Sequence, residues 1–171
     1  MIVNVEGDLL EIQKKLHLDY ICHQVNCQGA MNSGIAKQIR ETYPQVYEAY
    51  LNKYSETEDL LLSQNWFEQG GPSVSEVLLG QIQIIGIDNN HNIINMFSQE
   101  NYGYNGKRYT SYDAFWNCLN EIKQQIPEGA LLGFPYGIGC VRGGANWQVI
   151  LKMIETVFEN HYVYIVKLED K

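Results

Sequence analysis

Short β-branched segments alternate with segments of helical periodicity along this chain of 171 residues, and that alternation constrains its fold more than any other feature. Residues 2–6, 20–26, 131–134 and 162–168 are short apolar runs typical of strands. Apolar residues at helical spacing follow the first two runs and precede the last one. Strands that alternate with helices predict a helix, sheet, helix sandwich built on a mostly parallel sheet.

Two further apolar runs, residues 82–87 and 92–98, flank a polar stretch and predict a hairpin within this sheet. The expected fold class is therefore α/β, a three-layer α/β/α sandwich with a mixed, mostly parallel central sheet. Pro44 should end the helix that begins near residue 35, and residues 66–73, with two glycines and Pro72, predict an irregular connection. No repeat or linker divides the chain, so residues 1–171 should form a single domain.

The charge balance disfavours a nucleic-acid partner. The chain has 20 Asp and Glu against 12 Lys and Arg, a net charge of -8, whereas binding to phosphate backbones requires clustered cations. No apolar run approaches the roughly 18 residues of a membrane span, and the early Glu6 and Asp8 are unlike a signal peptide. We therefore expect a cytoplasmic protein without a membrane partner, whose oligomeric state the sequence does not predict.

The four cysteines indicate no metal site. Cys22, Cys27, Cys118 and Cys140 form no C-x-x-C pair and have no zinc-like spacing with the histidines. Free thiols in a reducing compartment are the expected state.

Two glycine-bearing loops, residues 28–34 and 137–144, each follow a predicted strand and precede a predicted helix. Ligands bind at such positions in open α/β sheets, and glycines beside a helix N-terminus let backbone N–H groups hold a diphosphate. Neither loop has the pattern of a P-loop or of a Rossmann fingerprint. Each could instead be a tight turn that needs positive φ, but the presence of two such loops favours a ligand.

Four polar side chains near these loops have a functional and a structural interpretation. Asn26 could form a hydrogen bond with a sugar hydroxyl or serve as a turn residue. His23 could transfer a proton, or it could lie in the core with its hydrogen bonds satisfied. Asp8 could accept from an adenine amino group or cap the following helix. Arg142 could bind a phosphate or extend into solvent.

Aromatic residues offer stacking surfaces that the sequence alone does not assign. Phe134, Tyr136, Tyr102 and Tyr104 are candidates, although most of the 12 tyrosines must simply pack. The polar residues 99–108 form either a rim over the cleft or an ordinary surface loop.

Taken together, these motifs resemble the macro domain family over the whole chain. Gly7-Asp8-Leu9 is similar to the family's adenine-binding motif, and Val25-Asn26-Cys27 with Gly34-Ile35-Ala36 is similar to its ribose-binding segment. Gly137-Ile138-Gly139-Cys140-Val141 is similar to the diphosphate-binding loop. The resemblance implies ADP-ribose or a derivative as the small-molecule partner, and the following ligand-binding residues: Asp8, Leu9, Asn26, Ser33, Gly34, Ile35, Gly137, Ile138, Gly139, Cys140, Val141 and Arg142.

Within the family, residues 23–29 and 33–36, together with Tyr43-Pro44, are most similar to ADP-ribose-1''-phosphate phosphatases. That branch implies catalysis by His23, as proton donor or base, beside Asn26, with neither metal nor cofactor. A related branch, which releases ADP-ribose from modified glutamates, uses a Lys and an Asp where this chain has Gln99 and Gly143. The first loop lacks the family's glycine run, and the second lacks an aromatic residue found in many members.

Three functions are consistent with these observations. The first is a hydrolase that acts at the distal ribose of an ADP-ribose derivative. The second is a reader or sequestering module for ADP-ribose-type signals, including cyclic or protein-linked forms, without chemistry. The third is an unrelated nucleotide-binding regulator, for which ATP or NAD would compete equally with ADP-ribose.

Overall fold

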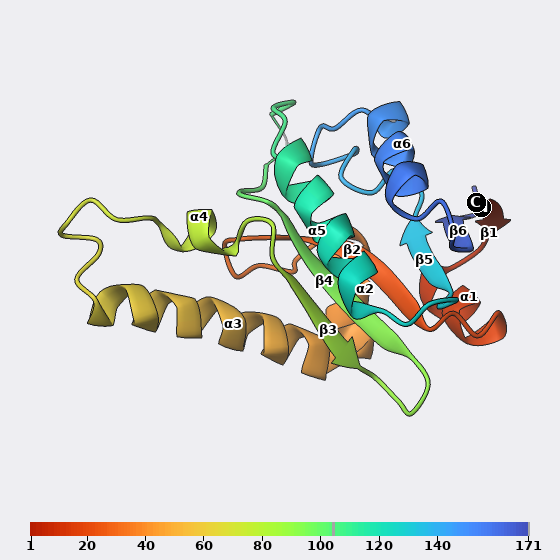
Figure 1. Ribbon diagram of the computed structural model, residues 1–171, viewed down its shortest axis with the longest axis horizontal. Helices are drawn as coiled ribbons and strands as arrows, with labels where there is room; N and C mark the ends of the chain where they lie inside the picture. The colour runs from red at the N-terminus through yellow and green to blue at the C-terminus, as the bar shows by residue number, and fades with distance from the viewer. Residues whose placement is uncertain (104, 171) are drawn as a thin grey trace.

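The computed structural model describes residues 1–103 and 105–170, and in these residues one six-stranded sheet carries helices on both faces (Figure 1). The strands are β1 (Ile2–Glu6), β2 (Tyr20–Asn26), β3 (Ile82–Gly86), β4 (Asn92–Gln99), β5 (Leu132–Pro135) and β6 (Val163–Lys167). The helices are α1 (Leu9–Lys15), α2 (Gly34–Thr42), α3 (Pro44–Ser63), α4 (Val74–Leu78), α5 (Tyr112–Gln125) and α6 (Trp147–Val157).

The sheet is mixed and mostly parallel, which confirms the predicted fold class. Its strand order is β1-β6-β5-β2-β4-β3. Every neighbouring pair is parallel except β3 and β4, which form the expected antiparallel hairpin. The carboxyl ends of β2 and β5 therefore lie at one edge of the sheet, and the two glycine-bearing loops emerge there.

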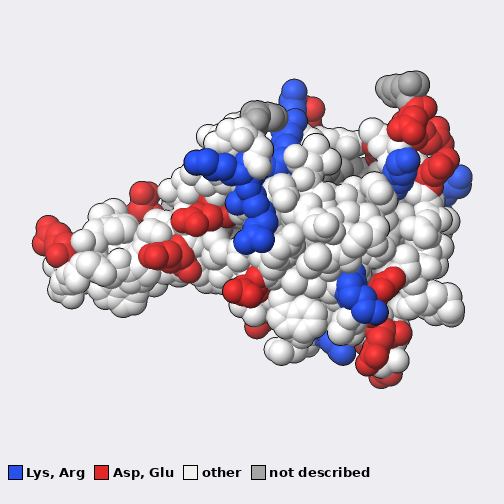
Figure 2. Space-filling model, turned by 90° about the horizontal axis from the view of Figure 1, so that it is seen from above, with Lys and Arg blue, Asp and Glu red and all other residues white. Residues whose placement is uncertain are grey.

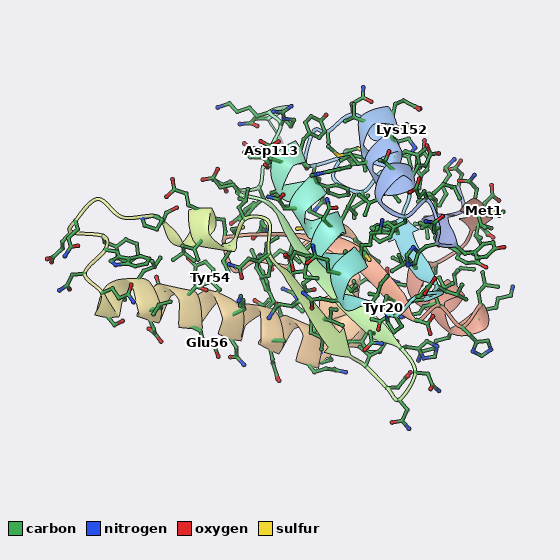
Figure 3. The ribbon with its side chains drawn as sticks, in the orientation of Figure 1. Met1, Tyr20, Tyr54, Glu56, Asp113 and Lys152 are labelled. Carbon is green, nitrogen blue, oxygen red and sulfur yellow. The ribbon has the colours of Figure 1, made fainter. Side chains whose placement is uncertain are left out.

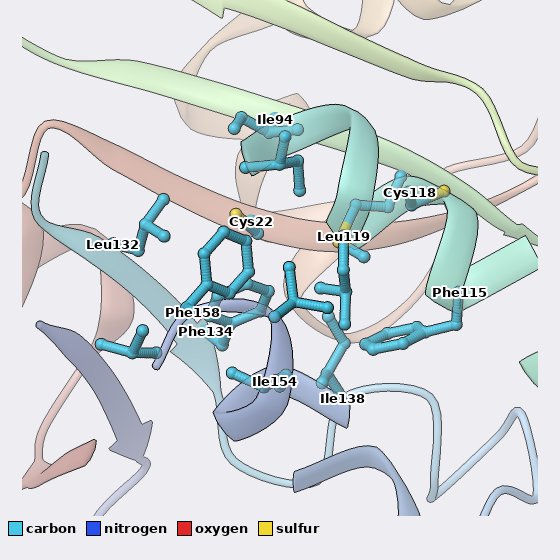
Figure 4. Close-up of a cluster of buried hydrophobic side chains, with 14 of the residues drawn as sticks. Cys22, Ile94, Phe115, Cys118, Leu119, Leu132, Phe134, Ile138, Ile154 and Phe158 are labelled. Atoms are coloured by element: carbon cyan, nitrogen blue, oxygen red, sulfur yellow. The ribbon is translucent and has the colours of Figure 1, made fainter. Parts of the chain in front are cut away.

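Apolar packing on both faces of the sheet holds the three layers together. On one face, Ile94 and Met96 of β4 pack with residues of α5 and α6 (Figure 4). On the other face, Ile93 packs with residues of α1 and α2, and Phe97 packs with Tyr50 of α3. Successive residues of β4 thus point to opposite layers, as the period of two in a strand requires. The central strands are buried on both sides.

Local sequence signals explain where the helices begin and end. Asp8 caps α1 by accepting from the backbone N–H groups of Leu10 and Glu11, and Pro44 occupies the first turn of α3, where it costs no hydrogen bond. The sequence interpretation missed α4. This helix of five residues begins with a capping box between Ser73 and Glu76.

None of the helices within residues 1–103 and 105–170 combines the length and apolar character needed to cross a bilayer. The same residues contain no group of three or more His, Cys, Asp or Glu arranged to hold a metal ion.

Candidate ligand-binding site

A pocket of about 500 Å³ lies between the two glycine-bearing loops at the carboxyl ends of β2 and β5. Its volume is within the usual range for sites that enclose a small molecule. The segment that follows β4 adds Tyr102 and Gly103 to one side. Of the residues expected to bind a ligand, those lining the pocket are Asn26, Ser33, Gly34, Ile35, Gly137, Ile138, Gly139, Val141 and Arg142.

The first wall of the pocket is the N-terminus of α2. Gly34 opens this helix with a φ of 57°, in the left-handed region that glycine tolerates. Ser33 is the N-cap residue, but its hydroxyl makes no capping hydrogen bond. The first backbone hydrogen bond of α2 runs from the N–H of Lys37 to the carbonyl of Ser33. The preceding N–H groups, at residues 34–36, therefore point a partial positive charge into the pocket.

Asn26 holds the first loop in place. Its Nδ2 donates to the Ala30 carbonyl at 2.8 Å, and its Oδ1 accepts from the backbone N–H of Gln28 at 3.0 Å. The Tyr50 hydroxyl lies 2.8 Å from both oxygens of Asn26 and accepts from the backbone N–H of Ala30. Burial raises the pKa of Tyr50 well above its ordinary value, so the phenol stays protonated. The acceptor of Asn26 is used within the protein, and one Nδ2 proton is left for a ligand.

The second wall is the loop 137–144, which packs on Thr110. The Thr110 hydroxyl donates to the Gly139 carbonyl at 2.8 Å and accepts from Nε2 of Gln24 at 2.9 Å. The backbone N–H of Thr110 donates to the Gly143 carbonyl at 2.9 Å. A Cβ on Gly139 would lie 2.5 Å from Oε1 of Gln24, and the φ of 74° at Gly139 also favours glycine. Thr110 is 2% exposed and supports the loop through these hydrogen bonds.

The contact with Thr110 fixes the backbone of the loop 137–144 around the pocket. Gly137 and Gly139 both have φ above 70°, which turns successive peptide units of the loop. The N–H groups of Gly139 and Val141 donate to no residue that the structure describes. Such a loop can hold an anion with backbone dipoles alone.

One end of the pocket is lined by Tyr136 and Leu168, which are 50% and 65% exposed. The Tyr136 ring packs against Trp147 at 4.8 Å between centroids, and Nζ of Lys167 lies 5.9 Å from its centre. These contacts fix a flat apolar surface at the mouth of the pocket. Phe134, a further stacking candidate, is buried in the core, and Tyr104 lies outside the described residues.

Charge is sparse in this pocket. Among the described residues that line it, Arg142 is the only cation, and none is a carboxylate, a lysine or a histidine. Gln24 and Gln99 form the polar end, joined by a hydrogen bond of 3.2 Å. The pocket is therefore suited to an anion held by backbone groups, and the described residues place no carboxylate or imidazole in its lining for proton transfer.

His23 does not reach this pocket. Its side chain is fully buried on the face of the sheet covered by α2 and α3, and its Nε2 lies 2.5 Å from Oδ1 of Asn95. Nδ2 of Asn95 donates to Gln83, whose own amide donates to the Ala49 carbonyl of α3. Burial lowers the pKa of His23 to about 4. The ring is thus a neutral member of a polar chain inside the core.

Three other expected ligand contacts also lie away from the lining. Asp8 caps α1 through one carboxylate oxygen and accepts from the Gln38 amide through the other. Leu9 is 5% exposed and belongs to the core beneath α1. Cys140 is half-buried, its thiol donates to the Ile138 carbonyl, and burial raises its pKa to about 11. Cys140 nevertheless lies beside the lining, because Ile138, Gly139 and Val141 of the same loop line the pocket.

Sequence reasoning missed Tyr50, Thr110 and Gln24, which hold the two loops. Tyr50 follows Val46 at helical spacing and predicts only a core contact. Thr110 belongs to no motif, and its role arises from an isolated bridge with Gln99 next to the second loop. Gln24 lies in a strand between two candidate residues, and its polarity within an apolar run was the one available signal.

Comparison with known proteins identifies the fold. No protein-family model matches the sequence, and no functionally curated protein matches it. A Bacteroides thetaiotaomicron protein of unknown function is 22% identical and superposes with a TM-score of 0.74, over 97% of this chain and 98% of that one. The macrodomain of Mycobacterium tuberculosis DarG is 20% identical, with a TM-score of 0.70 over 99% of both chains.

A third similar structure is Thermosipho africanus DarTG in complex with ADP-ribose. It is 15% identical and has a TM-score of 0.70, and the match covers 98% of this chain and 41% of the longer DarTG chain. These similarities extend over almost the whole of the present sheet and its covering helices. The chain therefore has the macrodomain fold.

Proposed function

We propose that the pocket binds ADP-ribose or a closely related derivative of it. The observation that carries this proposal is the pairing of two backbone anion sites across one pocket, the N-terminus of α2 and the loop 137–144. Together they match a diphosphate without a lysine or a metal ion. The structural similarity to a DarTG that holds ADP-ribose supports the same ligand.

The remaining ligand groups can be assigned to the two ends of the pocket. Tyr136 and Leu168 form the flat apolar end and suit the adenine ring, which stacks well on an aromatic side chain. Asn26, Gln24 and Gln99 form the polar end and suit the distal ribose. Arg142 is positioned at the lining to contact a phosphate oxygen.

Recognition without chemistry is the activity that this pocket supports best. The sequence interpretation placed His23 as the proton-transfer group of a phosphatase. In the structure His23 is fully buried and does not line the pocket, which favours recognition over that chemistry. Hydrolysis at the distal ribose is the second candidate. It is favoured by Gln24, Asn26 and Gln99, three uncharged amide side chains at the polar end that could orient a water molecule.

A calorimetric titration tests the binding site with a variant that adds a negative charge at the expected diphosphate position. Gly34→Asp places a carboxylate at the start of α2, where the diphosphate should bind, and Asp tolerates positive φ. We expect ADP-ribose affinity to fall by at least about tenfold, or roughly 1.4 kcal/mol. Gly34→Asn is the matched control, because it has nearly the same shape without the charge and should bind within a few-fold of the natural protein. Equal binding by both variants would contradict the site.

Two further measurements separate the functions. ATP and NAD should compete much more weakly than ADP-ribose, and equal competition would favour a general nucleotide regulator. Incubation with ADP-ribose-1''-phosphate should leave the substrate intact while it remains bound. Release of phosphate that persists in His23→Gln would establish the hydrolase and assign its chemistry to the amide end of the pocket.

A further inference from the structure

Most of the exposed large apolar side chains among the described residues belong to two groups. Tyr102, Tyr136, Val141 and Leu168 surround the ligand pocket. A second group lies within eight consecutive residues at the far end of α3 and in the turn after it. Its members are Leu60, Leu62, Trp66 and Phe67, which are 51%, 55%, 36% and 43% exposed. Apolar clusters of this kind on a folded domain mark sites of interaction.

This second group lies on a projecting element, defined here as the α3 arm, residues 56–68. A helix of 20 residues is about 30 Å long, and its second half extends beyond the sheet (Figure 1). Thr57 and Leu61 are buried, and Leu61 packs with Val74 and Leu78 of α4. Tyr54 and Glu56 extend from opposite sides of α3, with Tyr54 on the side of α4 (Figure 3). The arm is therefore supported along one side and open along the other.

The turn at the end of the arm has a defined backbone. The N–H of Trp66 donates to the Leu61 carbonyl, and that of Gly71 donates to the Trp66 carbonyl at 2.6 Å. A Cβ on Gly71 would lie 2.7 Å from Cβ of Trp66. The backbone and Cβ of Trp66 are thus held against the returning chain at Gly71, while the side chain is 36% exposed. Trp side chains are enriched among the residues that anchor protein interfaces.

The charge of the arm specifies the kind of partner. Residues 54–80 contain five carboxylates, and no Lys or Arg occurs between Lys53 and Lys107. The projecting end carries acidic and no basic side chains on the face shown in Figure 2. Carboxylates around an apolar group attract a cationic partner and repel nucleic acids, anionic membranes and a second copy of the same arm.

We propose that the α3 arm is a docking surface for a basic amphipathic segment of another protein. Apolar side chains of that segment would contact Leu60, Trp66 and Phe67, while its Lys and Arg side chains would face Glu58 and Asp59. None of these five residues lines the ligand pocket, so the surface is separate from the proposed ADP-ribose site.

The experiment uses the full chain and a fluorescein-labelled Leu/Lys peptide of about five helical turns as the probe. Binding is followed by anisotropy at low and high salt. We expect the double variant Leu60→Ser/Phe67→Ser to weaken binding by about tenfold, a typical loss for interface anchors. Glu58→Gln/Asp59→Asn should reduce the salt dependence. The matched control, Trp116→Ser/Val149→Ser, removes two exposed apolar side chains elsewhere and should bind as the natural protein does.

Two results would overturn the proposal. One is equal binding of the peptide by the natural protein and by Leu60→Ser/Phe67→Ser, and the other is no binding at all. Sedimentation of the protein without peptide adds a third result, because self-association lost in the same variant would assign the arm to a second copy. The arm variants should retain ADP-ribose affinity, so failure of this proposal is distinguishable from failure of the ligand assignment.

Discussion

Thr110 occupies the hollow beneath Gly143, so a Cβ added at Gly143 would overlap the Thr110 hydroxyl and the Gly139 carbonyl oxygen. The same hydroxyl donates to that carbonyl and accepts from Gln24 of β2. The shape of the ligand-binding loop therefore depends on a residue that belongs to no binding motif. Substitutions at Gly143 and Thr110 can therefore test whether the loop belongs to the binding site.

Gly143→Ala should deform the loop. Because the backbone atoms of Gly139 cannot move far, the added methyl group should lower the free energy of unfolding by about 1–3 kcal/mol. The distorted loop should also bind ADP-ribose more weakly. Thermal unfolding and calorimetry measure the two effects. Gly86→Ala is the control, because its added Cβ would make only an ordinary contact with Asn92 at 3.7 Å. Unchanged affinity in Gly143→Ala would show that this loop is not part of the binding site.

Thr110→Val keeps the volume of the side chain but removes two hydrogen bonds and leaves the Gln24 amide without one acceptor. We expect a loss of about 1–3 kcal/mol in stability, because two hydrogen bonds between partly buried groups are lost. Thr156→Val is matched to it, since the Thr156 hydroxyl bonds only to the Lys152 carbonyl on the exposed side of α6. Urea unfolding of both variants measures the difference, and equal losses would argue against a supporting role for Thr110.

The buried imidazole of His23 should make the protein less stable in acid. Its pKa is lowered to about 4 in the folded protein, whereas an unfolded chain has a His pKa near 6.5. The unfolded state thus binds more protons between these values, and stability should fall as the pH drops from about 6.5 to 4. The loss is roughly 3 kcal/mol and should be absent above pH 7.

His23→Gln keeps a donor for Asn95 and should remove most of this pH dependence. Urea midpoints at several pH values measure the effect. His17→Asn is the control, because His17 is exposed at a φ of 54°, a conformation that Asn tolerates. The buried assignment would be wrong if His23→Gln and the natural protein lost stability in parallel.

Arg142→Gln should weaken ADP-ribose binding by about tenfold, because a charge-assisted bond to a phosphate contributes more than a neutral one. Arg108→Gln is a close comparison. Arg108 stacks on Tyr112 at 4.6 Å and does not line the pocket, so its loss should change affinity little. Titrations at two salt concentrations should show a smaller salt dependence for Arg142→Gln alone.

Much of the fold could be predicted because its signals are local. The polar stretch between residues 82–87 and 92–98 predicts the β3–β4 hairpin, and the spacing of Phe115, Leu119 and Ile122 predicts α5. The convergence of the two loops follows from parallel strands whose carboxyl ends share an edge. Local patterns of this kind need no knowledge of distant partners.

The orientation of His23 could not be predicted in this way. Strand β2 is buried on both faces, so apolar residues occupy both sides and the alternation that would place His23 is hidden. Its partner Asn95 lies 72 residues away in β4. The support of the second loop by Thr110 likewise depends on a contact between segments that are distant in sequence. Such pairings follow from the assembled sheet.

The pairing of β1 with β6 has a consequence for how the chain folds. These strands are parallel from Ile2–Val163 to Glu6–Lys167, and the N–H of Gly7 extends the pairing to the carbonyl of Lys167. During synthesis, β1 leaves the ribosome first but has no neighbour until the sixth strand emerges. Closing so long a loop is slow, so the first strand should join the sheet last, after β2, β4 and β5 have assembled as a nucleus.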